Sequence, residues 1–241
     1  METFNIICID WQILAKADAP IFEGAARNAI KVGKAVGEKV VAKMLIGDLG
    51  QDPNIIQAVG HSMGGQLVVN VGRSAYEFSN QKIARVTGLD TAQLNLIADL
   101  SEDTIGPDYA YLANTAKLVD IHHTDSGLAV EGKASTMQPI GMVDFYPNGG
   151  VDMAGCEWSF WKSFCNHMKT VDYYVDSVNK RNDPNYLAGT KCDVYEAYEA
   201  GLCDQNEKLP MGEALTLDMV NLTGEPMKFY LNTNANPPFG Q

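Results

Sequence analysis

Residues 55–66, IIQAVGHSMGGQ, constrain the fold more than any other stretch of the chain. Mostly apolar residues run to Gly60, Ser62 follows, and Gly64 begins a segment with helical character. Glycines at these two positions let a strand and a helix approach too closely for a Cβ at either one. The pattern predicts a sharp strand–turn–helix connection that exposes the Ser62 hydroxyl as a nucleophile. The amide of Met63 would then face the oxyanion of a tetrahedral intermediate. The simpler alternative is a glycine-rich turn that happens to contain a serine.

Strand-like and helix-like segments alternate along the rest of the chain. Apolar runs predict strands at 4–10, 54–62, 83–90, 117–124 and 143–150, and at the start of 227–240. Apolar residues near a spacing of 3.6 predict helices at 22–46, 64–75 and 167–179. This alternation predicts an α/β domain with a mainly parallel sheet. The sequence has no evident linker or repeat, so we expect a single domain over residues 1–241.

The charge of the chain limits its partners. The formal net charge is −12. Nucleic acids and anionic membrane surfaces favour Lys and Arg, so neither is expected as the main partner. No apolar run approaches the roughly 20 residues of a transmembrane helix. We also expect no signal peptide in this chain, because the first residues lack a basic region followed by an apolar region and a cleavage site.

Four of the five cysteines lie in two local pairs. Cys156 is close to Cys165 in the sequence, and Cys192 is close to Cys203, whereas Cys8 stands alone in an apolar run. We expect two local disulfides and one thiol in the core, which implies an oxidising compartment. Five reduced thiols in the cytosol are the alternative. The spacing does not match a zinc site, so no metal is expected.

A nucleophilic serine needs a base and an acid that orients the base. After a strand–turn–helix serine, these are expected in the order acid, then histidine. Asp90 ends the next predicted strand, at the same edge of the sheet as Ser62, and His167 begins a predicted helix. In the alternative interpretation Asp90 is a turn or helix cap and His167 a surface histidine. His122 and His123 end a strand and are candidates for capping or packing roles.

Seven segments carry a resemblance to a known family. They are GHSMGGQ, RVTGLDTA, KLVDIHHT, PIGMVDFYPNGG, AGCEWSFWKSFCNHMKTVDYY, CDVYEAYEAGLC and FYLNTNANPPFG. Taken together and in this order, they resemble the animal lipase family, which includes pancreatic lipase, lipoprotein lipase, the secreted phospholipases A1 and the insect yolk proteins. The resemblance extends from about residue 4 to the C-terminus. It implies an α/β-hydrolase fold.

The resemblance also implies the roles of individual residues. Ser62 would be the nucleophile, Asp90 the acid and His167 the base of a triad that hydrolyses esters through an acyl-enzyme. The implied disulfides are Cys156–Cys165 and Cys192–Cys203. No metal or organic cofactor is required, and no calcium site is expected.

In this family a lid lies between the first two of these cysteines. The corresponding segment here, EWSFWKSF, has eight residues. Short lids in the family accompany phospholipase A1 activity more often than triglyceride hydrolysis. The aromatic side chains suit contact with a lipid interface, and they are Trp158, Phe160, Trp161 and Phe164. The alternative is that they cover the site or pack into the core.

The chain departs from the family pattern at its beginning. Family members carry an upstream segment that supplies a second oxyanion donor and a strand between the 4–10 strand and the strand before Ser62. We therefore expect an N-terminally shortened member that lacks the first strands, and loss of one such donor costs on the order of 10²–10³ in rate. Either residues 4–10 pair with the strand before Ser62, or backbone groups stay unpaired there. Thr91 and Met142 stand where the family usually has Pro and His.

Two functions remain open. The first is a secreted, extracellular carboxylic ester hydrolase of phospholipase A1 or neutral lipase type, acting on lipid or phospholipid at an interface. The second is a non-catalytic, lipase-like protein that binds lipid or serves as a yolk-type storage protein. Retention of all three triad residues favours the first, and the absence of the upstream donor favours the second. The sequence leads to no prediction of oligomeric state.

Overall fold

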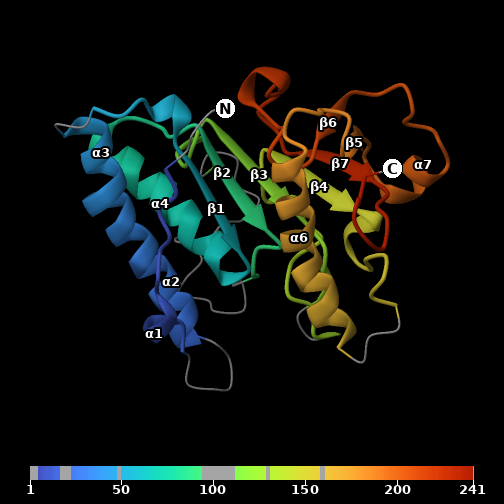
Figure 1. The fold of residues 1–241 in the computed structure, drawn as a ribbon, viewed down its shortest axis with the longest axis horizontal. Helices are drawn as coiled ribbons and strands as arrows, with labels where there is room; N and C mark the ends of the chain where they lie inside the picture. Colours follow the sequence, from blue (N-terminus) through green and yellow to red (C-terminus); the bar gives the residue numbers. More distant parts are fainter. Residues whose placement is uncertain are drawn as a thin grey trace.

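One mixed sheet of seven strands organises the part of the chain that this computed structural model describes, which is residues 5–16, 23–47, 50–93, 112–128, 131–157 and 161–240. The strands are β1 (Gln57–His61), β2 (Arg85–Leu89), β3 (Leu118–His122), β4 (Val143–Pro147), β5 (Ala188–Lys191), β6 (Lys208–Pro210) and β7 (Met227–Leu231). Their order across the sheet is β1-β2-β3-β4-β7-β5-β6 (Figure 1). The pairs β1–β2, β2–β3, β3–β4 and β4–β7 are parallel, and β5 is antiparallel to both β6 and β7. The predicted mainly parallel sheet is therefore confirmed.

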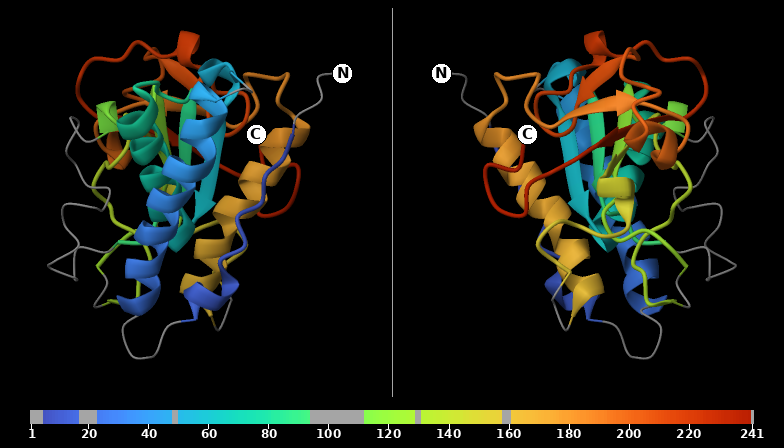
Figure 2. Two further views of the ribbon diagram at one scale, coloured as in Figure 1. Left: turned by 90° about the vertical axis from the view of Figure 1, so that its left-hand side faces the viewer. Right: turned by 90° about the vertical axis from the view of Figure 1, so that its right-hand side faces the viewer.

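Helices cover both faces of this sheet. The α-helices are α1 (Gln12–Ala15), α2 (Glu23–Val36), α3 (Ala42–Ile46), α4 (Met63–Ser79), α6 (Lys162–Asn179) and α7 (Tyr195–Glu199). The short 3₁₀ segments are η2 (Pro53–Ile55), η5 (Asn148–Gly150) and η6 (Leu217–Met219). Figure 2 shows α2 and α4 on one side of the sheet and α6 on the other. The helices predicted from the 3.6 spacing are all present.

Two glycines bring the helical segment that starts with α2 close to α4. A Cβ at Gly33 would lie 2.3 Å from the carbonyl oxygen of Leu67, and a Cβ at Gly37 would lie 2.5 Å from that of Val71. The second glycine begins a π-helical turn, η1 (Gly37–Val41), which leads into α3. The helix predicted over 22–46 thus forms with one wider turn inside it.

The core has two main parts, one on each face of the sheet. Under α2 and α4, buried aliphatic residues such as Val69, Val86 and Ile121 pack together. On the face covered by α6, Tyr173 packs with Phe145 and Phe229. Both parts exclude water from the strands that carry the candidate site, since β2, β3 and β4 are buried along their whole length.

The strand predicted for residues 4–10 was wrong where the structure describes it. Residues 5–10 form no strand, and the side chain of Ile6 is 86% exposed. Cys8, expected as a core thiol, is exposed. These residues do not pair with β1, which is the edge of the sheet, so among the described strands only β2 pairs with β1. An apolar run becomes a strand only where a neighbour completes its backbone hydrogen bonds.

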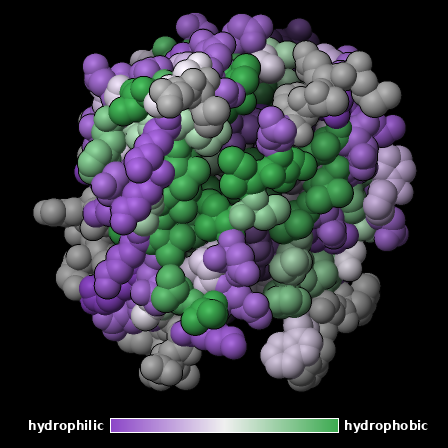
Figure 3. Space-filling model, turned by 60° about the vertical axis from the view of Figure 1, so that its left-hand side comes forward, coloured by the Kyte–Doolittle hydropathy of each residue, from purple (hydrophilic) through white to green (hydrophobic). Residues whose placement is uncertain are grey.

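The edge position of β1 leaves part of the molecule apolar at its surface. Residues of β1 are partly or fully exposed, unlike those of β2. Figure 3 turns the left-hand side of Figure 1 forward and shows hydrophobic side chains gathered across the centre of this face.

Among the described helices, none is long and apolar enough to cross a membrane.

Candidate active site

The turn between β1 and α4 has the strained geometry that the glycine pattern predicts. Ser62 adopts φ 56° and ψ −123°, and φ in this range favours glycine. A Cβ at Gly60 would lie 2.0 Å from the carbonyl oxygen of Gly64, so the close approach of strand and helix requires glycine at position 60. The same requirement predicted for Gly64 was wrong, because a Cβ there would meet nothing within 4 Å. The Ser62 amide donates to the carbonyl of Leu89 at 2.9 Å, and the Ser62 carbonyl accepts from the amide of Ala92 at 3.1 Å. These bonds hold the turn against the end of β2.

Asp90 directly follows β2 and lies at the same edge of the sheet. Its side chain is fully buried, and its Oδ2 lies 2.6 Å from Nδ1 of His167. Three donors reach the other carboxylate oxygen, Oδ1: the amides of Thr124 at 2.7 Å and Asp125 at 3.0 Å, and the hydroxyl of Ser135 at 2.6 Å. The acid is thus held on both oxygens by groups from three different parts of the chain.

These contacts decide the charge of Asp90. Burial by itself raises the pKa of Asp90, but the hydrogen bond and charge of His167, with the bonds from Ser135 and Thr124, lower it below its ordinary value. The acid is therefore ionised at neutral pH. A carboxylate can only accept hydrogen bonds, so His167 donates from Nδ1 and its Nε2 is left as the acceptor.

His167 lies in the first two turns of α6, close to the serine turn. Its side chain is 13% exposed. The ring of His61 lies 4.3 Å from the ring of His167, centroid to centroid, and Nε2 of His61 donates to the His167 carbonyl at 2.9 Å. Burial, and then the charge of His167, lower the pKa of His61. His61, which directly precedes Ser62, is therefore neutral and connects the serine turn to α6.

The structure brings the predicted acid and base into direct contact, but it does not bond the serine to them. Within the described residues, no hydrogen bond joins the Ser62 hydroxyl to His167. Met63, the predicted oxyanion donor, is the first residue of α4. Amides in the first turn of a helix have no acceptor within the helix, so this N–H is available to a ligand.

The predicted lid is described only in part. Trp158 and Phe160 lie outside the described residues. Trp161 is 71% exposed and Phe164 is 65% exposed, so core packing, the alternative for these aromatics, was wrong for these two. Both lie next to the start of α6, two turns or less from His167.

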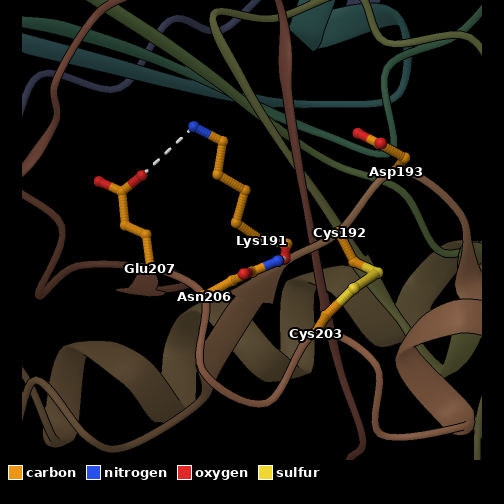
Figure 4. A pocket seen from close by; sticks show the side chains of 6 residues that line it. All are labelled: Lys191, Cys192, Asp193, Cys203, Asn206 and Glu207. Atoms are coloured by element: carbon orange, nitrogen blue, oxygen red, sulfur yellow. Dashed lines mark hydrogen bonds and ion pairs between the residues drawn. A yellow bond between two sulfur atoms is a disulfide. The ribbon is translucent and has the colours of Figure 1, made fainter.

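Both predicted disulfides are present, Cys156–Cys165 and Cys192–Cys203. The first joins Cys156, in the segment before α6, to Cys165, which lies in α6 two residues before His167. The second borders an open cavity of about 380 Å³ at the opposite end of the sheet from β1 (Figure 4). Its lining residues are Lys191, Cys192, Asp193, Cys203, Asn206 and Glu207. None of the predicted triad residues lines this cavity.

The two remaining histidines pack in the core, which confirms one of the two roles predicted for them. His123 is buried, stacks on Tyr146 at 4.4 Å and lies 2.8 Å from Asp144. His122 is also buried, with its Nε2 3.2 Å from Asp120. Neither side chain is hydrogen-bonded to Asp90 or Ser62, and His122 meets Asp90 only through its backbone carbonyl, which accepts from the Asp90 amide at 2.8 Å. The histidine whose side chain contacts the Asp90 carboxylate is His167.

Two buried polar contacts were not predicted from the sequence. Arg85 binds both carboxylate oxygens of Asp120 at 2.7 Å, in the fully buried centre of the sheet. Burial raises the pKa of Asp120, but the charge and hydrogen bonds of Arg85 outweigh it and hold that pKa far below its usual range. The second contact is the hydrogen bond from the Ser135 hydroxyl to Oδ1 of Asp90. Among the described residues, no group of three or more His, Cys, Asp and Glu is placed to hold a metal ion.

A mainly parallel sheet with helices on both faces, and a serine on a strained strand–turn–helix connection, are typical of the α/β-hydrolase fold. A family model for Lipase matches residues 1–239. The chain therefore belongs to the lipase family of the pancreatic type, as the resemblance predicted.

Individual relatives agree with this assignment. Pancreatic triacylglycerol lipase of Oryctolagus cuniculus is 32% identical over 259 residues, covering 100% of this chain and 52% of the relative. Pancreatic triacylglycerol lipase of Sus scrofa is 31% identical, with coverage of 100% and 54%. Inactive pancreatic lipase-related protein 1 of Canis lupus familiaris is 28% identical, with coverage of 100% and 52%. The chain thus spans about half the length of these curated relatives.

Proposed function

We propose that this protein hydrolyses carboxylic esters of lipids, with Ser62 as nucleophile, His167 as general base and Asp90 as the acid that orients it. The observation that carries the proposal is the 2.6 Å contact between Asp90 and His167 at the edge of the sheet where the strained Ser62 turn lies. Hydrogen bonds that keep a buried acid ionised are what a histidine base requires. We propose that residues 1–241 act as one domain.

The proposed reaction follows from the orientation of His167. Because Nδ1 donates to Asp90, Nε2 takes the proton of the Ser62 hydroxyl as the oxygen attacks the ester carbonyl. The amide of Met63 donates to the oxyanion, and the N-terminus of α4 favours its charge. His167 then gives the proton to the departing alcohol. Water then attacks the acyl carbonyl as Nε2 of His167 takes its proton, and that proton passes to the Ser62 oxygen as the carboxylic acid leaves.

The finer assignment is a phospholipase A1 or neutral lipase that acts at a lipid interface. The exposed rings of Trp161 and Phe164 beside α6 support it, since they are positioned to contact a lipid layer. Two disulfides support an extracellular location.

A second candidate function is a non-catalytic lipase-like protein that binds or stores lipid. Two observations favour it. The Ser62 hydroxyl is not bonded to His167 in the described part of the chain, and one relative of equal coverage is named an inactive lipase-related protein.

The decisive experiment is labelling of the purified protein with a fluorophosphonate, which reacts with an activated serine. We expect labelling of the wild type and none of Ser62→Ala, with Ser79→Ala as a matched control that loses a half-buried hydroxyl at the far end of α4, where it donates to the Ala75 carbonyl. Hydrolysis of phosphatidylcholine vesicles and of triacylglycerol emulsions then separates the two lipase types. A folded wild type that neither reacts nor hydrolyses, yet binds vesicles, would establish the second function.

A further inference from the structure

Ser135 is a buried hydroxyl that faces the acid of the candidate site. It lies in the loop between β3 and β4, 45 residues from Asp90 in the sequence, and is fully buried. Its Oγ donates to Oδ1 of Asp90 at 2.6 Å. Ser126 Oγ lies 3.2 Å from the same hydroxyl. A serine has one hydroxyl proton, which Ser135 gives to the carboxylate, so Ser126 is the donor in the second contact.

The backbone of Ser135 is fixed by its own hydrogen bonds. Its amide donates to the carbonyl of Asp125 at 3.2 Å. Its carbonyl accepts from the amide of Gly127 at 3.0 Å and from the side chain of Gln93 at 3.0 Å. The hydroxyl therefore reaches Asp90 from an anchored position.

The two carboxylate oxygens of Asp90 accept hydrogen bonds from different groups. Oδ1 accepts from Ser135, Thr124 and Asp125, and Oδ2 accepts from His167. Of the three donors on Oδ1, the hydroxyl of Ser135 is the one that belongs to a side chain and that substitution can remove. A carboxylate anchored at Oδ1 has one remaining oxygen with which to orient the imidazole.

We propose that Ser135 is a positioning residue that fixes the rotation of the Asp90 carboxylate, so that Oδ2 faces Nδ1 of His167. The role rests on the proposed function, in which these two groups are the acid and the base of the triad.

The test compares Ser135→Ala with Ser126→Ala, which removes a neighbouring buried hydroxyl that does not touch Asp90. On a soluble ester, Ser135→Ala should lower kcat about tenfold, the order expected for one hydrogen bond to a charged group, and leave KM unchanged. Ser126→Ala should change kcat less than about twofold, well below that loss.

A double-mutant cycle separates positioning from a general structural effect. In the Asp90→Asn background, Ser135→Ala should change the fluorophosphonate labelling rate of Ser62 little, because the carboxylate it orients is gone. An equal loss in both backgrounds, or no loss in either, overturns the proposal. If Ser135→Ala does not fold, Ser135→Cys keeps the volume with a weak donor, and full wild-type kcat in that variant also overturns it.

A readout independent of activity distinguishes failure of this inference from failure of the proposed function. The Nδ1 proton of His167, in its short bond to Asp90, should give a downfield proton NMR resonance. This resonance should move in Ser135→Ala and stay in place in Ser126→Ala, even if Ser62 proves unreactive. An unmoved resonance in Ser135→Ala overturns the positioning role whether or not the enzyme is active.

Discussion

Replacing Asp90 by Asn tests the orientation of His167 while keeping most of the surrounding hydrogen bonds. Three donors converge on Oδ1, so the amide oxygen of Asn must take that position. The amide NH₂ then takes the place of Oδ2 and faces Nδ1 of His167. Because an NH₂ group only donates, the imidazole must accept at Nδ1 and carry its proton on Nε2. That tautomer cannot take a proton from Ser62.

The size of the effect follows from the loss of the correct tautomer. In serine triads this change lowers kcat about 10⁴-fold, equivalent to about 5.4 kcal/mol of transition-state stabilisation. The fold should tolerate the change, because Oδ1 keeps its three donors, and the free energy of unfolding should fall by no more than about 1–2 kcal/mol. In Asp90→Ala the same three donors lose their acceptor, at about 1–3 kcal/mol each. That variant should lose at least about 3 kcal/mol.

Stopped or continuous hydrolysis of a fluorogenic short-chain ester measures kcat, and urea unfolding measures stability. Asp90→Asn should be nearly inactive and well folded, and Asp90→Ala inactive and clearly destabilised. If Asp90→Asn kept more than about a tenth of wild-type kcat, Asp90 would not set the tautomer of His167 and the proposed triad would be wrong. If the two variants were equally stable, the three donors on Oδ1 would not be the anchor inferred from the structure.

Three further changes test packing, charge and the exposed rings. Gly33→Ala should lower the free energy of unfolding by about 1–3 kcal/mol, because its Cβ would lie 2.3 Å from a backbone oxygen of α4. Gly24→Ala, with nothing within 4 Å, should be neutral or stabilising in the same urea titration. The pKa of Asp120 is lowered in the folded state despite burial, because its guanidinium partner outweighs desolvation. The stabilisation that ionised Asp120 provides is therefore complete above about pH 3.9, the ordinary pKa of an aspartate, and is lost as the pH falls through the lower pKa of the folded state. The difference in free energy of unfolding between the wild type and Asp120→Asn should be largest near pH 7 and smaller in acid. Trp161→Ala with Phe164→Ala should weaken sedimentation with phosphatidylcholine vesicles several-fold and leave soluble-ester turnover unchanged; equal losses in both assays would show that the rings support the site itself.

The parts of the fold that local chemistry dictates could be predicted from the sequence. Gly60 is required where β1 meets α4, because a Cβ there would lie 2.0 Å from the carbonyl oxygen of Gly64, and the strained turn at Ser62 was predicted from the glycine spacing. The acid after β2 and the histidine in α6 were predicted from their order along the chain, and the structure brings the two into contact. Spacing and family resemblance were also enough to pair the four disulfide cysteines correctly.

The parts that depend on distant partners could not be predicted. Residues 5–10 have the composition of a strand, but a strand also needs a neighbour, and no sequence pattern shows whether one is available. β5 and β6 contain only four and three residues, too few for a periodic signal. Ser135 is one hydroxyl in a loop, and only the fold brings it to Asp90.

The two halves of the candidate site are supported unequally. Asp90 follows β2, which has a strand on either side, and buried loops donate to its Oδ1, whereas His167 lies in α6 and is held by Oδ2 of Asp90. Ser62 follows β1, an edge strand with a single strand neighbour among those described, and a segment held on one side opens at lower cost. The contact from His61 to the carbonyl of His167 joins the two halves. Because the pKa of His61 is lowered, first by burial and then by the charge of His167, His61 stays neutral at the stage when His167 becomes an imidazolium. It can therefore hold the serine turn to α6 throughout the reaction without placing a second positive charge beside the base.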